Sequence, residues 1–194
     1  TIVVIRGDTG RGKSLTGRLW HQRTNHGRTH YCELEERTTY HRFLRALAGA
    51  MGMAKGQSSE SYRHDITRRL SRRNTIVLDE AGHLYNPKRP DPAAFDMLRS
   101  LHDERHCGVV LIFTLPYWEA ILHGPMAGFF EQFLGRVTYE LEIPPGVIYA
   151  AEIEAICRAF CPEPDPEMVD VAGQIAKDNR GKIRILVTTL EQAA

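Results

Sequence analysis

The 194-residue sequence lacks several features that would place it in a broad structural class. It has no run of 18 apolar residues, so we expect no transmembrane helix and no membrane partner. It has four cysteines and no Cys-x-x-Cys pair, which disfavours a disulfide framework and favours reduced thiols in a cytoplasmic protein. It also shows no internal repeat and no low-complexity tract, which excludes a repeat array and a largely disordered chain.

The chain also lacks an initiator methionine and a leader in which charged residues precede an apolar stretch. It begins at Thr1 within a hydrophobic stretch, and we therefore expect the natural protein to carry a segment before this residue.

The sequence has no excess of charge of one sign, because 25 Lys and Arg against 24 Asp and Glu leave a formal net charge of only +1. The two signs are nevertheless unevenly distributed: residues 1–75 hold 15 Lys and Arg against 6 Asp and Glu, whereas residues 76–194 hold 10 against 18. This asymmetry predicts a polyanionic partner for the first half, or unlike surfaces that stack in an assembly. Arginines that merely solvate helix faces explain it equally well.

Apolar stretches bounded by turn residues alternate with segments that have apolar residues at helical spacing. The stretches lie at residues 1–6, 29–34, 75–80, 107–114 and 136–143. This alternation predicts an α/β fold, a parallel sheet with helices on both faces. After the turn residues Pro144, Pro145 and Gly146 only helical patterns follow, at about 150–160, 166–178 and 181–192. We therefore predict an α/β domain at residues 1–145 and a small C-terminal helical lid at residues 146–194.

The segment GDTGRGKS, residues 7–14, fits the phosphate-loop pattern G-x-x-x-x-G-K-[S/T] at every fixed position. Its glycines allow backbone N–H groups to turn toward phosphate oxygens, and the helix that begins here adds its positive N-terminal end. Lys13 is expected to reach the β- and γ-phosphates of ATP, and the Ser14 hydroxyl to hold Mg²⁺. The residues predicted to contact the nucleotide are Gly7, Asp8, Thr9, Gly10, Arg11, Gly12, Lys13, Ser14 and Leu15.

Two adjacent carboxylates, Asp79 and Glu80, end the apolar stretch at residues 75–80. We expect Asp79 to help to hold the Mg²⁺ and Glu80 to polarise the attacking water. A kinase that transfers phosphate to a small molecule does not need the second carboxylate. The pair therefore predicts ATP hydrolysis, although acidic pairs at strand ends also occur as solvated edges.

The phosphate loop, the sequence DEAGHL at 79–84, a further strand with a polar end and a helical lid together resemble an AAA+ ATPase. DEAGHL followed by FDMLRSLHDERHCGVVLIFT is similar to the DNA-transposition ATPases of the MuB, TniB, TnsC and IstB type, over nearly the whole chain. The resemblance implies an ATPase that binds double-stranded DNA and assembles into a ring or helical filament of identical subunits. It also implies that this assembly regulates or recruits a transposase.

The resemblance assigns roles to three further residues. Thr114 corresponds to the polar sensor of the γ-phosphate, although the transposition group often has Gly-Asn or Gly-Thr where this chain has Phe113 and Thr114. Arg136 corresponds to the arginine finger that one subunit supplies to its neighbour's ATP. Arg184, in a G-x-x-R pattern, corresponds to a nucleotide sensor in the lid. A threonine that ends a strand, a surface arginine and a basic helix start are the ordinary alternatives.

In the resembled group, two loops line the bore of the assembly and contact DNA. They correspond here to residues 35–40 and 52–59, and the candidate DNA contacts are Arg37, Thr38, Lys55 and Gln57. Contacts of this type with phosphates give sequence-independent, salt-sensitive binding. Glu35 and Glu36 argue against a simple basic stripe.

Other functions also fit the sequence. Within the AAA+ class, the chain fits a helicase-loader-like or secretion-associated ATPase. From another class, a P-loop kinase acting on a small molecule shares the phosphate loop, but Glu80 and the C-terminal position of the lid argue against it. A nucleotide-gated interaction module with negligible turnover is the remaining alternative.

Overall fold

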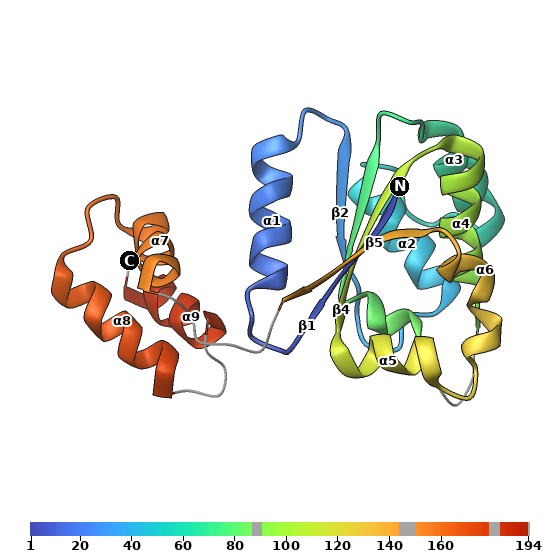
Figure 1. Cartoon of the computed structure of the whole chain (residues 1–194). Helices are drawn as coiled ribbons and strands as arrows, with labels where there is room; N and C mark the ends of the chain where they lie inside the picture. The colour runs from blue at the N-terminus through green and yellow to red at the C-terminus, as the bar shows by residue number, and fades with distance from the viewer. Residues whose placement is uncertain (87–90, 144–149, 179–182, 194) are drawn as a thin grey trace. The chain divides into compact units, whose positions relative to one another are not determined.

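The computed structural model describes residues 1–86, 91–143, 150–178 and 183–193 (Figure 1). Its strands are β1 (Ile2–Gly7), β2 (Thr29–Glu33), β3 (Thr75–Asp79), β4 (Gly108–Thr114) and β5 (Val137–Ile143). Its α-helices are α1 (Lys13–Thr24), α2 (Tyr40–Ala50), α3 (Ser59–Arg69), α4 (Ala93–Arg105), α5 (Leu115–His123), α6 (Glu131–Leu134), α7 (Ala150–Phe160), α8 (Pro166–Asp178) and α9 (Ile183–Ala193). Two short 3₁₀ helices, η1 (Ala81–Leu84) and η2 (Ala127–Phe129), complete the described elements.

The strands form one sheet in the order β2-β3-β4-β1-β5. β2, β3 and β4 pair in parallel, with Thr29 opposite Thr75 and Thr75 opposite Gly108. Helix α1 lies on one face of the sheet, and α2, α3 and α4 lie on the other (Figure 1). The prediction of an α/β fold with a parallel sheet and helices on both faces is confirmed.

The strands at the centre of the sheet are buried because helices cover both faces. Ile76 and Leu78 of β3 and Leu111 of β4 are fully buried. Helix α2 contributes an apolar stripe that includes Phe43 and Leu47, and both side chains are inaccessible to solvent. This packing fixes β2 and β3 side by side, so the side chains at their ends keep a defined spacing.

The chain divides into two compact units, one of Thr1–Arg6 with Ser14–Glu142 and one of Gly7–Lys13 with Ile143–Ala194. In the second unit, α7, α8 and α9 pack around a separate apolar cluster formed by Ile153, Cys157, Ala172, Ala176, Leu186 and Leu190. The domain boundary predicted at residues 145 and 146 lies outside the described residues. None of the described helices is long and apolar enough to cross a membrane.

Candidate functional site

The loop between β1 and α1 has a backbone shaped by glycine. Gly10 and Gly12 have φ values of 78° and 76°, a region in which an L side chain is strained. Lys13 is only 8% exposed, and its Nζ donates hydrogen bonds to the carbonyl oxygens of Gly7 at 2.9 Å and Asp8 at 2.7 Å. A glycine-rich turn that holds an ammonium group at the start of a helix fits the phosphates of a nucleotide. The other predicted nucleotide contacts in this segment are exposed at Asp8 and Thr9 and half-buried at Arg11 and Leu15.

Asp79, at the end of β3, is fully buried and both of its carboxylate oxygens accept hydrogen bonds. Its Oδ1 accepts from the Ser14 hydroxyl at 3.1 Å and from the Glu80 backbone N–H at 3.0 Å. Its Oδ2 accepts from the Tyr31 hydroxyl at 2.5 Å. The structure thus brings together Ser14 and Asp79, the two residues predicted to hold Mg²⁺. A hydroxyl and a carboxylate are oxygen ligands of the kind that this ion prefers, so the pair fits it.

Tyr31 of β2 was not predicted as a site residue. Burial raises the pKa of its hydroxyl, and the hydrogen bond to Asp79 and the negative charge of Asp79 raise it further, so the hydroxyl keeps its proton and remains a donor. Arg18 of α1 extends the network, because its side-chain hydrogen bond with Tyr31 raises the Arg18 pKa. The Arg18 guanidinium also donates to the Glu33 carboxylate at 2.7 Å. An aromatic residue in a strand ordinarily indicates core packing, so the sequence carried no signal for this contact.

Glu80 is half-buried and has an unusual backbone conformation. Its φ of 53° lies in the left-handed region, which among the described non-glycine residues is shared only by Arg37 and His106. A residue in such a conformation loses about 1–3 kcal/mol of stability. Residues of this kind are found mainly at functional sites, where the surrounding structure keeps the backbone in place. Here the Glu80 N–H donates to Asp79 and the Glu80 carbonyl accepts from the His83 N–H at 2.9 Å.

Hydrogen bonds tie the end of β2 to this same turn. The Leu34 N–H donates to the Asp79 carbonyl at 3.1 Å, and the Leu34 carbonyl accepts from His83 Nδ1 at 2.9 Å. Arg37 lies three residues beyond Leu34, and it lines a pocket together with His83 and Tyr117. The loop that contains two of the candidate DNA contacts, Arg37 and Thr38, is therefore anchored directly to the carboxylate turn.

The three residues assigned by resemblance lie in different places. Thr114 ends β4, is half-buried and makes no side-chain capping bond to α5. Arg136 precedes β5, and its Nε donates to Oδ1 of Asp103 in α4 at 3.0 Å, which lowers the pKa of that carboxyl. Arg184 belongs to α9, but its side chain lies outside the described residues.

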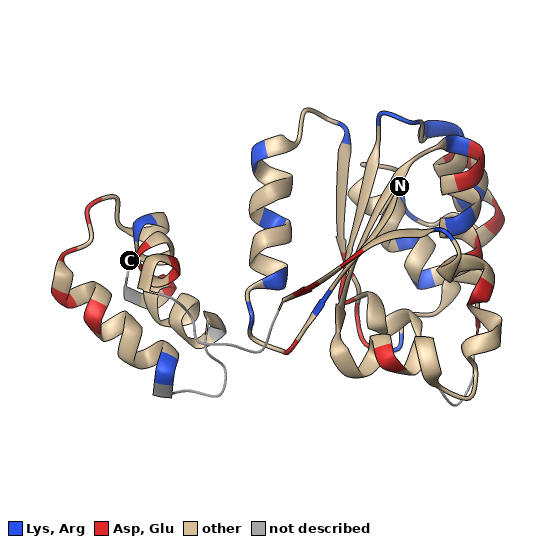
Figure 2. Ribbon diagram, viewed as in Figure 1, with Lys and Arg blue, Asp and Glu red and all other residues tan. Residues whose placement is uncertain are grey.

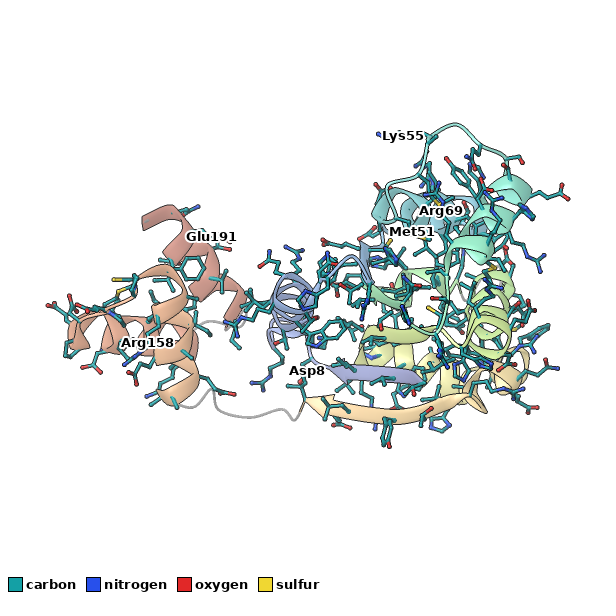
Figure 3. The ribbon with its side chains drawn as sticks, turned by 90° about the horizontal axis from the view of Figure 1, so that it is seen from above. Asp8, Met51, Lys55, Arg69, Arg158 and Glu191 are labelled. Carbon is teal, nitrogen blue, oxygen red and sulfur yellow. The ribbon has the colours of Figure 1, made fainter. Side chains whose placement is uncertain are left out.

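The structure divides three of the four candidate DNA contacts between two surfaces, and Gln57 lines neither of them. Thr38 and Lys55 line one groove, to which Arg42 and Arg45 of α2 also contribute. Lys55 projects from the loop between α2 and α3 (Figure 3). Arg37 lines the other pocket, described above. Arg42 and Arg45 were not predicted, because their helical segment was interpreted from its apolar stripe alone.

Gln57 and Thr38 are partly engaged within the chain. The Gln57 side-chain oxygen accepts from the Ser61 hydroxyl at 3.3 Å, and the Thr38 hydroxyl donates to the Glu35 carbonyl. Lys55 and Arg37 are exposed. The two basic side chains are therefore better placed than Gln57 and Thr38 to reach an external phosphate.

Several solved structures of other proteins are similar to this chain. Aeropyrum pernix ORC1 in complex with DNA is 25% identical, with a TM-score of 0.68 over 100% of this chain and 53% of that one. Aeropyrum pernix ORC2, in ADPNP-ADP complexes, is 14% identical, with a TM-score of 0.71 over 99% of this chain and 55% of that one. Domain III of the Thermotoga maritima replication initiation protein DnaA is 18% identical, with a TM-score of 0.58 over 98% of this chain and 74% of that domain.

The chain spans about half the length of the two ORC proteins. A search of curated protein sequences gave no match. Residues 1–121 match the AAA domain family, and the protein therefore belongs to that family, as its AAA+ resemblance predicted.

Proposed function

We propose that this protein is an ATP-dependent, DNA-binding AAA+ ATPase that oligomerises on double-stranded DNA and regulates or recruits a transposase. The observation that carries the nucleotide part is the hydrogen bond between Ser14 and Asp79, which lie 65 positions apart in the chain. The DNA part is supported by the similarity to an ORC1 protein in complex with DNA. The transposition part is supported by the resemblance that begins at DEAGHL.

The kinds of residue present fit ATP and Mg²⁺. The loop at residues 7–13 and the Lys13 ammonium would bind the triphosphate, and Ser14 and Asp79 would hold Mg²⁺. The bound nucleotide supplies the phosphoryl group that is transferred to water.

The residues of this chain then act on the water and on the developing charge. The Glu80 carboxylate accepts the proton of the attacking water, and the Thr114 hydroxyl serves as the polar sensor of the γ-phosphate. The Tyr31 hydroxyl holds Asp79 in one orientation. Arg136 of a neighbouring subunit stabilises the charge that develops in the transition state, so hydrolysis depends on assembly.

A mixing experiment tests whether the site is shared between subunits. Arg136→Ala should retain ATP binding and lose most turnover and DNA-dependent assembly, whereas Lys13→Ala should lose ATP binding. If Arg136 acts in trans, an equal mixture should recover turnover, to about a quarter of wild type when subunits pair at random. Phosphate release with and without duplex DNA measures turnover, and electron microscopy shows whether filaments form.

The structure offers a matched control for Arg136→Ala. Asp103→Asn breaks the same ion pair but keeps the guanidinium, so this variant should keep its turnover. Absence of recovery at every mixing ratio would contradict the shared site. Equal loss of turnover in Asp103→Asn would show that the Arg136 effect is structural.

A replication-linked role, as in a helicase loader, is the second candidate function. It is favoured by the similarity to the replication initiation protein DnaA. Both candidates place an ATP-bound assembly on duplex DNA, and they differ in the protein that the assembly engages. Stimulation of strand transfer by a transposase supports the first candidate, and retention of a replicative helicase on DNA supports the second.

A further inference from the structure

Basic residues gather at the N-terminal ends of β2 and β3 (Figure 2). Five of them are exposed arginines. Four of them lie within six residues at the end of α3 and in the turn before β3. The fifth precedes β2, which pairs with β3 so that the Thr75 N–H donates to the Arg28 carbonyl at 2.9 Å. We name this set the arginine edge, and its members are Arg28, Arg68, Arg69, Arg72 and Arg73.

The turn that bears Arg72 and Arg73 is held by its own hydrogen bonds. The Asn74 N–H donates to the Ser71 carbonyl at 2.9 Å, and the Asn74 side-chain oxygen accepts from the Ser71 N–H at 3.0 Å and hydroxyl at 2.9 Å. Arg105 Nε donates to the Leu70 carbonyl at 3.0 Å and so anchors the end of α3. The polar groups of the turn are thus used internally, and its two central residues present arginine side chains on a fixed backbone.

All five arginines are exposed, and none forms an ion pair with a carboxylate within the described part of the chain. Elsewhere in that part, Arg6, Arg18, Arg136 and Arg158 each contact a carboxylate within 4.0 Å. A group of like charges without counter-charges repels itself and attracts an anionic partner. The arginine fork matches phosphate oxygens in pairs, which lysine cannot do.

The arginine edge exposes little apolar surface, which favours a nucleic acid over a protein as its binding partner. Protein interfaces usually have an apolar core, but Leu70, the apolar residue among residues 68–74, is fully buried. A phosphodiester backbone needs only cationic contacts. The edge therefore suits an extended polyanion rather than a protein surface.

We infer that the arginine edge binds the phosphodiester backbone of a nucleic acid without requiring bound ATP. It lies at the opposite end of β3 from Asp79, about 15 Å away at the usual rise per strand residue. It is also distinct from the candidate contacts at Arg37 and Lys55. The inference does not rest on the proposed function, because neither hydrolysis nor assembly contributes to it.

The test measures the affinity of the full chain, without nucleotide, for a fluorescent duplex of arbitrary sequence between about 50 and 200 mM salt. If the five arginines each contact one phosphate, a plot of the logarithm of affinity against the logarithm of salt concentration should have a slope of about −4.5. The double variant Arg72→Gln/Arg73→Gln should make that slope less steep by about 2. Affinity should fall about 10-fold in that variant. Arg68→Gln/Arg69→Gln should have a similar effect.

The control removes the same charge elsewhere. The double variant Arg158→Gln/Lys177→Gln replaces one basic residue in α7 and one in α8, and it should bind the duplex as the wild type does. If the edge variants and this control show equal affinity and slope, the inference is wrong. It is also wrong if the edge variants lose only self-association in sedimentation while duplex binding persists.

Lys13→Ala separates this inference from the proposed function. It should abolish ATP-dependent assembly and leave nucleotide-free duplex binding unchanged. Loss of both would show that the edge does not act independently of the nucleotide site. If ATP-dependent assembly fails in the wild type while the edge variants still weaken duplex binding, only the proposed function falls.

Discussion

The charged side chains at the two ends of β3 differ in their burial and in their partners. At the C-terminal end, Asp79 is fully buried, and its oxygens accept hydrogen bonds from Ser14 and Tyr31. At the N-terminal end, Arg72 and Arg73 are exposed on a rigid turn and meet no carboxylate among the described residues. One strand of five residues therefore separates a closed polar network from an open charged surface.

The difference follows from the cost of burial. A buried carboxylate must be paired or hydrogen-bonded, so the groups around Asp79 are held in fixed positions and suit a small ligand of defined geometry. Exposed arginines carry no such requirement, and water satisfies them. They attract an anion over a distance, but they define no pocket, so they suit an extended polyanion.

The largest effect is expected at the C-terminal end of β3. Glu80→Gln keeps the size of the side chain but loses the carboxylate that, in the proposed function, accepts a proton from water. Turnover should fall by about 10²-fold or more, the scale of a general base, while ATP binding is retained. Phosphate release and binding of a fluorescent ATP analogue measure the two properties.

Two control measurements accompany this prediction. Glu131→Gln removes an exposed carboxylate from α6 and should leave turnover unchanged. Nucleotide-free duplex binding should be the same in both variants, because the arginine edge is untouched. Wild-type turnover in Glu80→Gln would remove Glu80 from the mechanism.

A smaller effect is expected from Tyr31→Phe, which removes the hydroxyl that bonds both Asp79 and Arg18. If Asp79 holds Mg²⁺ as proposed, the Mg²⁺ concentration needed for half-maximal turnover should rise about 10-fold, whereas kcat at saturating Mg²⁺ should change little. The raised pKa of Tyr31 keeps the hydroxyl protonated, so the effect should be constant from about pH 7 to about pH 9. A Mg²⁺ titration of ATP turnover at each pH measures it.

The control for this variant is Tyr139→Phe, which removes a hydroxyl from an exposed residue of β5 and should change nothing. A fall in kcat without a change in Mg²⁺ dependence would contradict the positioning role. Unchanged turnover at limiting Mg²⁺ would show that the hydroxyl serves only the packing of β2.

The residues of the candidate nucleotide site could be singled out from sequence because their patterns are local. The fixed spacing of residues 7–14 and the acidic pair after an apolar stretch need no knowledge of the fold. The contact of Tyr31 with Asp79 depends instead on β2 lying beside β3, with Tyr31 opposite Val77. Strand order is a property of the folded chain, and the sequence pattern of one strand does not contain it.

The charged surfaces show the same limit. The excess of arginine in residues 1–75 is visible by counting, but only the pairing of β2 with β3 brings Arg28 close to the turn at residues 71–74. The ion-pair partner of Arg136 could not be predicted from the sequence either, because Asp103 lies 33 positions earlier, in α4. Counting charges identifies an asymmetry, and the fold decides which charges are neutralised.

The smallest expected effect is a change in Tm. It is predicted for two variants, one that breaks the ion pair of an arginine with a carboxylate and one that removes an arginine without such a partner. Arg136 bonds Asp103, whereas Arg72 meets no carboxylate among the described residues. Both members of the pair are partly exposed, with side-chain exposures of 44% and 32%, so the pair contributes at most about 0.5 kcal/mol. Asp103→Asn should therefore lower Tm at neutral pH by only about 1–2 °C, and Arg72→Gln should leave it unchanged or slightly raised.

The pH dependence identifies the source of that small difference. The hydrogen bond from Arg136 lowers the pKa of Asp103 in the folded state below its unfolded value. The stabilisation is therefore fully present above the unfolded pKa of about 4 and is lost as the pH falls through the lower, folded pKa. The Tm difference between wild type and Asp103→Asn should close as the pH is lowered past the folded pKa of Asp103, which thermal unfolding followed by circular dichroism can measure. A difference that persists below that pKa would exclude the ion pair as its source. A comparable loss in Arg72→Gln at neutral pH would mean that the turn arginines contribute to the fold, and the contrast between the two ends of β3 would fail.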